Sequence, residues 1–304
     1  MRIGVMGAGA VGCYYSGMLA RGGHEVVLVG RPVHVEAMRE HGLRMETAAF
    51  DERIAVEAAT EPEVIAGCDV VLVAVKSADT EAVGEQLRPL LAPGALVLSL
   101  QNGIDNADRL AAVLPDQRVE AAVVYVATEM GGPGHVRHHG RGELVVGPGA
   151  APIAGDFEAA DIPMTVTASA ADVRAALWAK LTANCAWNAL SAITDRPYGW
   201  LHTVDGVAGP SGVLADVVAE CRAVARAEGI DLPPDALAQV ESLAGSMPGQ
   251  RSSTAQDLAR GRPTEIAHLN GYVVRRGVEL GVPTPVSRLL LTLVAALERR
   301  AAEG

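Results

Sequence analysis

The stretch 3-IGVMGAGAVG-12 decides the fold of the first half of the chain. A short apolar strand pattern, Met1–Met6, runs directly into a G-x-G-x-x-G turn, and a helical pattern, Val11–Arg21, follows it. In this order Gly7 permits a tight turn, Gly9 lets the backbone approach a pyrophosphate, and Gly12 allows close packing of helix on strand. The alternative is a glycine-rich turn without a ligand. We predict a dinucleotide-binding loop made of Gly7, Ala8, Gly9, Ala10, Val11 and Gly12.

Further apolar runs continue this pattern. Strands are predicted at 24–30, 69–75, 95–100 and 119–126, with helices at Thr80–Leu91 and Asn106–Leu114 between them. The runs are continuously apolar rather than alternating, which is typical of parallel strands covered on both faces. The sequence therefore predicts a doubly wound α/β sheet.

The pattern changes near Asp172, after which Gly and Pro separate helical segments. The predicted helices are Asp172–Ile193, Gly212–Glu228, Pro234–Met247, Thr264–Leu280 and Val286–Ala302. We therefore expect an α/β fold in which a Rossmann-type doubly wound domain, residues 1–170, precedes an all-helical domain, residues 171–304. A cleft between the two domains is the expected ligand site.

Composition narrows the class of protein. The 304 residues are 49% hydrophobic and 3% aromatic, so the cores must consist largely of Ala, Val and Leu. A net charge of −11 argues against nucleic-acid binding, which needs surplus cations, but not against a small anionic ligand. The four scattered cysteines fit reduced thiols. Without a signal-like start or an apolar run long enough for a membrane span, a soluble cytoplasmic protein is expected.

The ends of the predicted strands suggest which dinucleotide binds. NAD-binding proteins usually place an acid after the second strand, whereas this chain has 29-VGRP-32. Arg31 would pair with the 2′-phosphate of NADP, unless it is an ordinary exposed arginine. Lys76 and Asn102 follow two later strands, at the sheet edge where such folds bind ligands, although a solvated role is the alternative. We predict NADP(H) as the cofactor.

Two other kinds of chemistry receive little support. His135, His138 and His139 lie close together in 134-GHVRHHGRGELVVG-147, but the segment looks like a hairpin and no Cys or acidic cluster completes a metal site. No metal is therefore expected. The sequence also lacks the G-x-S-x-G motif of serine hydrolases.

The helical stretch 178-WAKLTANCAWN-188 carries Lys180, Asn184 and Asn188 at steps of four, so the three polar groups share one helix face. A solvated stripe is the simple explanation, but the flanking Trp, Leu and Cys residues leave little else polar nearby. An ammonium can stabilise and protonate a carbonyl oxygen during reduction, and asparagine both donates and accepts hydrogen bonds. We therefore predict that this face lines a ligand cleft, where the three side chains would suit such chemistry.

Together these motifs resemble the ketopantoate reductases (2-dehydropantoate 2-reductases), which make pantoate for coenzyme A synthesis. The resemblance runs from Met1 to about Ala302 and rests on GAGAVG, VGRP, VAVKS, QNG, K-L-T-A-N-x-x-x-N, RSS-x-x-QD and TEI-x-x-LNG, in that order. It implies NADPH-dependent reduction of a 2-keto acid to a 2-hydroxy acid.

The resemblance also implies the role of each residue. Lys180 would be the proton donor, and Glu265, expected in the first turn of a helix beginning at Pro263, would complete the site beside the nicotinamide ribose or the substrate hydroxyl. Asn184 and Asn188 would bind the hydroxyl and carbonyl ends of the substrate, and Ser253 its carboxylate. Asn102 would lie beside nicotinamide and substrate, while Arg31 and Lys76 would hold the phosphate end of NADP.

One position departs from the family pattern, and several alternatives follow. Many ketopantoate reductases have a substrate-binding asparagine where this chain has Tyr198, a larger residue that could exclude ketopantoate or admit another substrate. The chain could therefore act on a different 2-keto acid, or oxidise a hydroxy acid. A non-catalytic NADP sensor is a third interpretation. The Leu-rich segment 286–297 would also allow the helical domain to form a homodimer.

Overall fold

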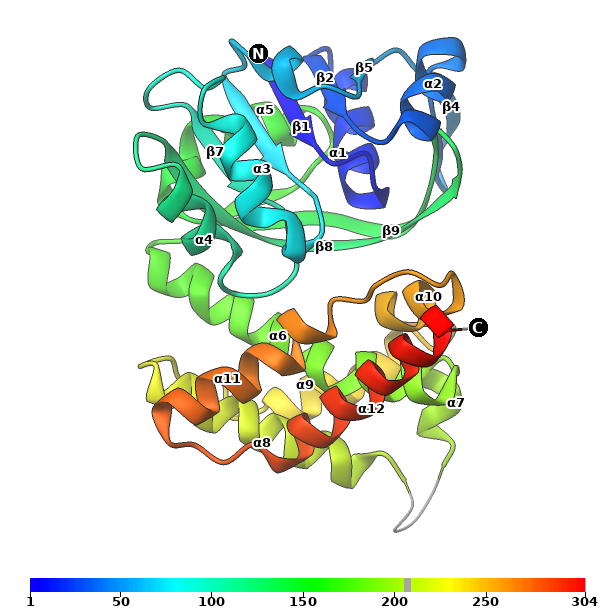
Figure 1. Cartoon of the computed structure of the whole chain (residues 1–304), viewed down its shortest axis with the longest axis vertical. Coiled ribbons are helices and arrows are strands. Elements are labelled where there is room, and N and C mark those ends of the chain that lie inside the picture. The colour runs from blue at the N-terminus through cyan, green and yellow to red at the C-terminus, as the bar shows by residue number, and fades with distance from the viewer. Residues whose placement is uncertain (205–208, 304) are drawn as a thin grey trace. The chain divides into compact units, whose positions relative to one another are not determined.

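The computed structural model describes residues 1–204 and 209–303. The chain forms two compact units, Met1–Val173 and a second that begins at Arg174 (Figure 1). The first holds the sheet, and the described part of the second consists of helices and their connections.

Six parallel strands form the centre of the first unit. In spatial order they are β5 (Glu57–Ala59), β2 (Glu25–Val29), β1 (Arg2–Met6), β6 (Val70–Val73), β7 (Leu96–Ser99) and β8 (Arg118–Gly132). In chain order this is the 3-2-1-4-5-6 arrangement of the Rossmann fold. The predicted doubly wound sheet is confirmed.

Alternate residues of these strands enter two separate cores. On one face Ile3, Val5 and Leu28 join the core beneath α1 (Ala10–Arg21). On the other face Val27 and Val29 join the core under α3 (Thr80–Leu87) and α4 (Asn106–Val113). Because side chains alternate along a strand, a strand covered on both faces must be apolar throughout. This explains the continuous apolar runs in the sequence.

A second sheet extends from the long strand β8. Its first residues pair with β7, and from Ala122 it pairs antiparallel with β9 (His135–Val146). The segment 134–147, predicted to look like a hairpin, is instead the single strand β9 preceded by a turn at Gly134, where φ is +60°. It forms a hairpin with β8. The remaining strands of this sheet are β3 (Leu43–Glu46), β4 (Asp51–Ile54) and β10 (Met164–Val166).

The sequence-based prediction missed the short strands β3, β4, β5 and β10. Strands of three or four residues show too little periodicity to stand out in a sequence. It also missed the helical segments α2 (Pro32–His41), η1 (Pro62–Ile65), η2 (Ser77–Asp79), η3 (Pro148–Ile153) and α5 (Ala154–Ala159).

The second unit contains α7 (Tyr198–His202), α8 (Ser211–Ala227), α9 (Ala236–Ser246), α10 (Ser253–Ala259), η5 (Ile266–His268), α11 (Asn270–Leu280) and α12 (Pro285–Glu303). The predicted helices that became α8, α9 and α12 are confirmed to within two residues at each end. The short helices α7 and α10 were not predicted.

The long helix α6 (Ala170–Thr194) has clear start and stop signals. Ser169 and Asp172 form a reciprocal capping box: the Asp172 carboxylate accepts the Ser169 backbone N–H at 2.9 Å, and the Ser169 hydroxyl accepts the Asp172 N–H at 3.3 Å. At the other end Asp195 has φ +55°, the left-handed conformation that ends many helices. The capping box explains why α6 starts two residues before the predicted Asp172.

The predicted helix Thr264–Leu280 is wrong in its first part, whereas its second part is α11 and ends at the predicted Leu280. The backbone is broken at Leu269, where φ is −102° and ψ is −99°, so a short 3₁₀ turn, η5, precedes α11. Glu265 precedes η5 and does not occupy the first turn of an α-helix. The break lets Asn270 enter the core fully buried, where its side chain donates a 3.1 Å hydrogen bond to the Cys185 carbonyl on α6.

Candidate active site

The glycine loop between β1 and α1 has the geometry that its sequence predicts. Gly7 has φ +116°, and a Cβ added there would lie 2.8 Å from the carbonyl oxygen of Ala74. A Cβ on Gly12 would overlap the Gly7 carbonyl oxygen. A Cβ on Gly9, by contrast, would have no neighbour within 4 Å. Gly7 and Gly12 therefore make the turn possible, while Gly9 leaves open space of the kind that a pyrophosphate requires.

The other predicted cofactor residues follow neighbouring parallel strands. Arg31 comes after β2, the glycine loop after β1, Lys76 after β6 and Asn102 after β7. Because these strands are parallel, the fold brings all four positions to the carboxyl edge of one sheet. Arg31 and Lys76 are exposed and Asn102 is half-buried. This is the edge where open α/β sheets bind ligands.

A buried polar network holds the Asn102 loop. The Asn102 carbonyl accepts hydrogen bonds from the Ser77 hydroxyl at 3.0 Å and from the Asn106 side-chain amide at 2.6 Å. Thr80 donates to the Asn106 side chain at 3.0 Å, and Gln101 donates to Thr80 at 2.8 Å. The network joins the segment after Lys76 to the segment containing Asn102. Sequence reasoning missed these supporting residues. Their one signal in the sequence was that polar side chains follow directly after the apolar strand runs.

The polar face of α6 lies in a mostly apolar environment. Trp178, Leu181 and Cys185 are at most 1% exposed, whereas Lys180 and Asn184 are partly exposed. Asn188, one turn further along, is only 4% exposed. A solvated stripe would not bury its last member, so this environment supports a binding role for the face.

The N-terminus of α10 contacts α6 at Asn188. Ser252 is 1% exposed and caps α10 by accepting the Ala255 N–H at 3.0 Å. Its hydroxyl also donates to the Asn188 carbonyl at 3.1 Å, and its backbone N–H donates to the Ser191 hydroxyl. The predicted carboxylate ligand Ser253 is the exposed first residue of α10. Sequence reasoning missed Ser252, although serine before a helix is a common capping signal.

Tyr198 also contacts Asn188. Its hydroxyl donates a 3.3 Å hydrogen bond to Asn188 Oδ1, and its ring packs on Trp187 with 5.0 Å between centroids. Tyr198 is 6% exposed, and burial raises the pKa of its phenol well above the usual range. The hydroxyl therefore stays protonated at neutral pH.

Glu228 anchors the other end of α6, and sequence reasoning missed it. Its side chain is 5% exposed and accepts hydrogen bonds from Trp178 and Arg174 of α6 and from Tyr272 and Arg276 of α11. Burial by itself raises the pKa of the Glu228 carboxyl, but these donors, Arg276 foremost, outweigh it and hold the pKa below its ordinary value. The ionised carboxylate thus fixes α6 two residues before Lys180.

Glu265 lies in the segment between α10 and η5. It is partly exposed, and its carbonyl accepts the His268 N–H at 2.8 Å. Five residues later, the bond from Asn270 to the Cys185 carbonyl attaches this segment to α6 one residue after Asn184.

The histidines of β9 have ordinary partners. His135 lies 2.9 Å from Glu46, His139 lies 3.4 Å from Glu129, and His138 stacks on Tyr14. Among residues 1–204 and 209–303, no group of three His, Cys, Asp or Glu side chains is arranged to hold a metal ion. Over the same residues, no helix is both long and apolar enough to cross a membrane.

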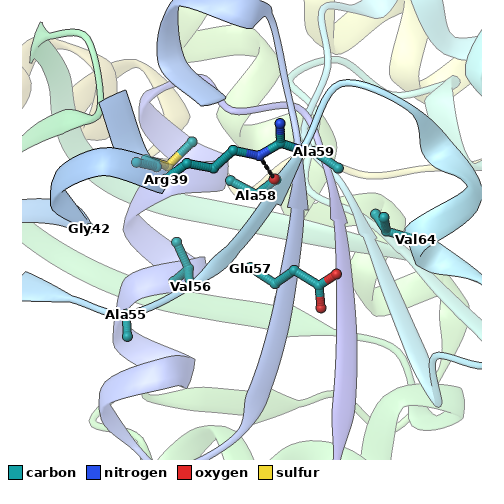
Figure 2. A pocket seen from close by; sticks show the side chains of 9 residues that line it. Arg39, Gly42, Ala55, Val56, Glu57, Ala58, Ala59 and Val64 are labelled. Atoms are coloured by element: carbon teal, nitrogen blue, oxygen red, sulfur yellow. Dashed lines mark hydrogen bonds between the residues drawn. The ribbon is translucent and has the colours of Figure 1, made fainter. Parts of the chain in front are cut away.

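A pocket of about 480 Å³ lies in the first unit (Figure 2). It is lined by the end of α2, by residues 55–59 around the edge strand β5, and by Val64 of η1. Arg39 donates to the Ala58 carbonyl at 2.8 Å across it. None of the predicted site residues lines this pocket.

A dinucleotide-binding sheet, together with a helical unit that presents an amine and two amides on one helix face, defines a nicotinamide-dependent oxidoreductase. The sequence model of the family "Ketopantoate reductase PanE/ApbA" matches residues 3–151, and that of its C-terminal region matches residues 172–298. The chain belongs to the ketopantoate reductase family.

Individual relatives agree over nearly the whole chain. The 2-dehydropantoate 2-reductase of Halobacterium salinarum is 36% identical, covering 98% of this chain and 99% of its own. A crystal structure of a PanE/ApbA family ketopantoate reductase from Ralstonia eutropha is similar, with a TM-score of 0.94, 55% identity and 99% of both chains covered. A ternary structure of D-mandelate dehydrogenase with NADH and anilino(oxo)acetate gives a TM-score of 0.90 at 26% identity, also over 99% of both chains.

Proposed function

We propose that the chain reduces 2-dehydropantoate (ketopantoate) to pantoate with NADPH, with Lys180 as the proton donor. The names of the curated relatives support the substrate, and the glycine loop supports the dinucleotide. When bound, the cofactor supplies a hydride to the keto carbon of the substrate. The residues of this chain then have to hold the substrate and protonate its oxygen.

The use of lysine at position 180 carries the proposal. The chain has only two lysines among 25 cationic residues, Lys76 and Lys180, and both are predicted site residues. A guanidinium keeps its proton at any working pH, whereas an ammonium with an ordinary pKa of about 10.4 can release one. A carbonyl oxygen that gains negative charge needs both a positive charge and a proton. Lysine meets both needs, and arginine meets only the first.

The remaining roles follow from the chemistry of each side chain. Asn184 and Asn188 offer amides for the polar groups of the substrate, and Ser253 offers an exposed hydroxyl for its carboxylate. Asn102, held by its buried network, would lie beside nicotinamide and substrate. Glu265 would complete the site next to the nicotinamide ribose or the substrate hydroxyl.

For the cofactor, the phosphate-binding roles fall to Arg31 and Lys76. Arg31 is exposed, begins α2 as its N-cap, and makes no side-chain hydrogen bond or ion pair with residues 1–204 and 209–303. Such a guanidinium is available to bind the 2′-phosphate that distinguishes NADPH from NADH.

A second candidate function is the reduction of another 2-keto acid, or the reverse oxidation of a 2-hydroxy acid. It is favoured by the structural similarity to a D-mandelate dehydrogenase that binds NADH. A non-catalytic NADP sensor is the third reading, and the presence of Lys180 argues against it because a sensor needs no proton donor.

The test is consumption of NADPH, followed at the nicotinamide absorbance, with ketopantoate, benzoylformate and a panel of other 2-keto acids. Rapid turnover of ketopantoate with pantoate as product is expected. Turnover of benzoylformate alone would favour the second function. No turnover, combined with tight NADPH binding, would favour the sensor.

The expected homodimer stays a prediction. Helix α12 exposes Leu289 and Leu293 one turn apart, at 57% and 41%. Sedimentation velocity of the wild type and of a Leu289→Glu, Leu293→Glu variant would show whether this face joins two copies.

A further inference from the structure

We propose that Tyr198 is a positioning residue: it orients the Asn188 amide so that its N–H groups are left for the substrate, and so selects 2-keto acids with a hydroxyl on C4. The inference rests on the proposed function and deepens it. It changes the expectation that the bulk of Tyr198 acts directly on the substrate.

The ring of Tyr198 is held inside the helical unit. It packs against Trp187, which is fully buried. The backbone N–H groups of Tyr198 and Gly199 donate to the carbonyls of Gln250 and Pro248, at 3.0 and 2.9 Å. With its backbone and ring fixed, Tyr198 can act on its surroundings mainly through its hydroxyl. The larger size of tyrosine relative to asparagine is taken up by core packing.

The hydroxyl determines how the Asn188 amide is oriented. A phenol has one hydrogen to donate, and an amide accepts only through oxygen. Donation from Tyr198 therefore commits Asn188 Oδ1, and Ser252 fixes the backbone of the same residue from another side. Within residues 1–204 and 209–303, Asn188 Nδ2 makes no hydrogen bond. The atom is nevertheless not completely buried, so a ligand can reach it. An amide donor held in this way remains available to a ligand.

The available N–H groups fit an oxygen acceptor on the substrate. In the proposed reaction Lys180 serves the keto oxygen and Ser253 the carboxylate. We assign the C4 hydroxyl of ketopantoate to the Asn188 amide because its oxygen is already committed to Tyr198, so that it can only donate. A substrate with a methyl group at that position would displace water from the amide. The amide would then lose its hydrogen bond to water and gain none from the substrate. We expect this to reduce kcat/KM by about 10-fold to 100-fold.

The experiment compares ketopantoate with trimethylpyruvate, which is ketopantoate without its C4 hydroxyl. The wild type should prefer ketopantoate. Tyr198→Phe should lower the ratio of kcat/KM for ketopantoate to kcat/KM for trimethylpyruvate about 10-fold, because the Asn188 amide is free to turn in this variant. Tyr272→Phe is the matched control: it removes another buried phenol of the same unit, bonded to Glu228, and should leave the ratio unchanged.

A double-mutant cycle separates positioning from direct contact. If Tyr198 acts through Asn188, adding Tyr198→Phe to Asn188→Ala should not change the ratio further. A further loss of similar size would show direct contact and overturn the proposal. Equal losses on both substrates in Tyr198→Phe would reveal a purely structural role and also overturn it. If the wild type reduced neither keto acid, the proposed function itself would fail.

Discussion

Gly12 lies directly against the carbonyl oxygen of Gly7, so the first turn of α1 and the end of β1 approach more closely than any side chain would allow. Gly9, between them in the sequence, faces open space. Two glycines of one motif therefore serve the fold, and we expect the third to serve the ligand. Alanine substitutions at Gly12 and Gly9 should therefore have different effects on stability.

Gly12→Ala should destabilise the protein, since its Cβ would overlap backbone that cannot move away. We expect a loss of about 1–3 kcal/mol in the free energy of unfolding, together with weaker NADPH binding. Gly9→Ala should keep the thermal unfolding temperature of the wild type but also weaken NADPH binding, because its Cβ enters the open space. Thermal unfolding and NADPH fluorescence titration check both variants. Equal destabilisation by the two would contradict this division of roles.

Arg31→Ala should weaken NADPH binding by about 10-fold or more and leave NADH binding nearly unchanged, because only NADPH has the 2′-phosphate. Arg39→Ala is the control. It removes another arginine of α2, one that donates to the Ala58 carbonyl. Titration of each variant with both cofactors gives the comparison. Equal losses of NADPH and NADH affinity in Arg31→Ala would exclude recognition of the 2′-phosphate by Arg31.

Glu228 should make stability depend on pH. Its pKa is lower in the folded than in the unfolded protein, so its contribution is complete above the ordinary value of about 4.3 and is lost as pH falls through the lowered value. The unfolding temperature of Glu228→Gln should therefore lie furthest below that of the wild type at neutral pH, and the gap should narrow in acid.

Glu279→Gln is the control for Glu228, because Glu279 pairs with the same Arg276 but is 57% exposed. Its unfolding temperature should stay near that of the wild type at every pH. If the difference in unfolding temperature between Glu228→Gln and the wild type did not change with pH, the ionised Glu228 carboxylate could not be the source of that difference.

The sequence predicted those parts of the fold that have strong local signals. The continuous apolar runs became β1, β2, β6 and β7, and the Gly7–Gly12 turn formed as expected, because local sterics decide such a turn. The edge strands, and the break at Leu269, depend on tertiary contacts such as the bond from Asn270 to Cys185, which no local pattern encodes. The wrong start of the helix predicted at Thr264–Leu280 has this cause.

Within the candidate site, the sequence indicated the residues with distinctive chemistry but not those that hold them. Glu228 and Ser252 looked like ordinary polar residues of the helical segments, yet both are buried against α6. Tyr198 stood out by its size alone, whereas its bond to Asn188 depends on how α7 folds back on α6. Such contacts join residues distant in sequence or separated by a turn, so spacing does not reveal them.

The most direct test of the account is to measure NADPH oxidation on ketopantoate by the wild type, Lys180→Ala and Lys180→Arg in parallel, with NADPH binding measured for each. The wild type should form pantoate in step with NADPH consumption. Both variants should bind NADPH but lose on the order of 10²–10⁴ in kcat, since arginine keeps the charge but cannot donate the proton. Wild-type turnover by Lys180→Arg would contradict proton donation by Lys180, and an inactive wild type would contradict the proposed reaction itself.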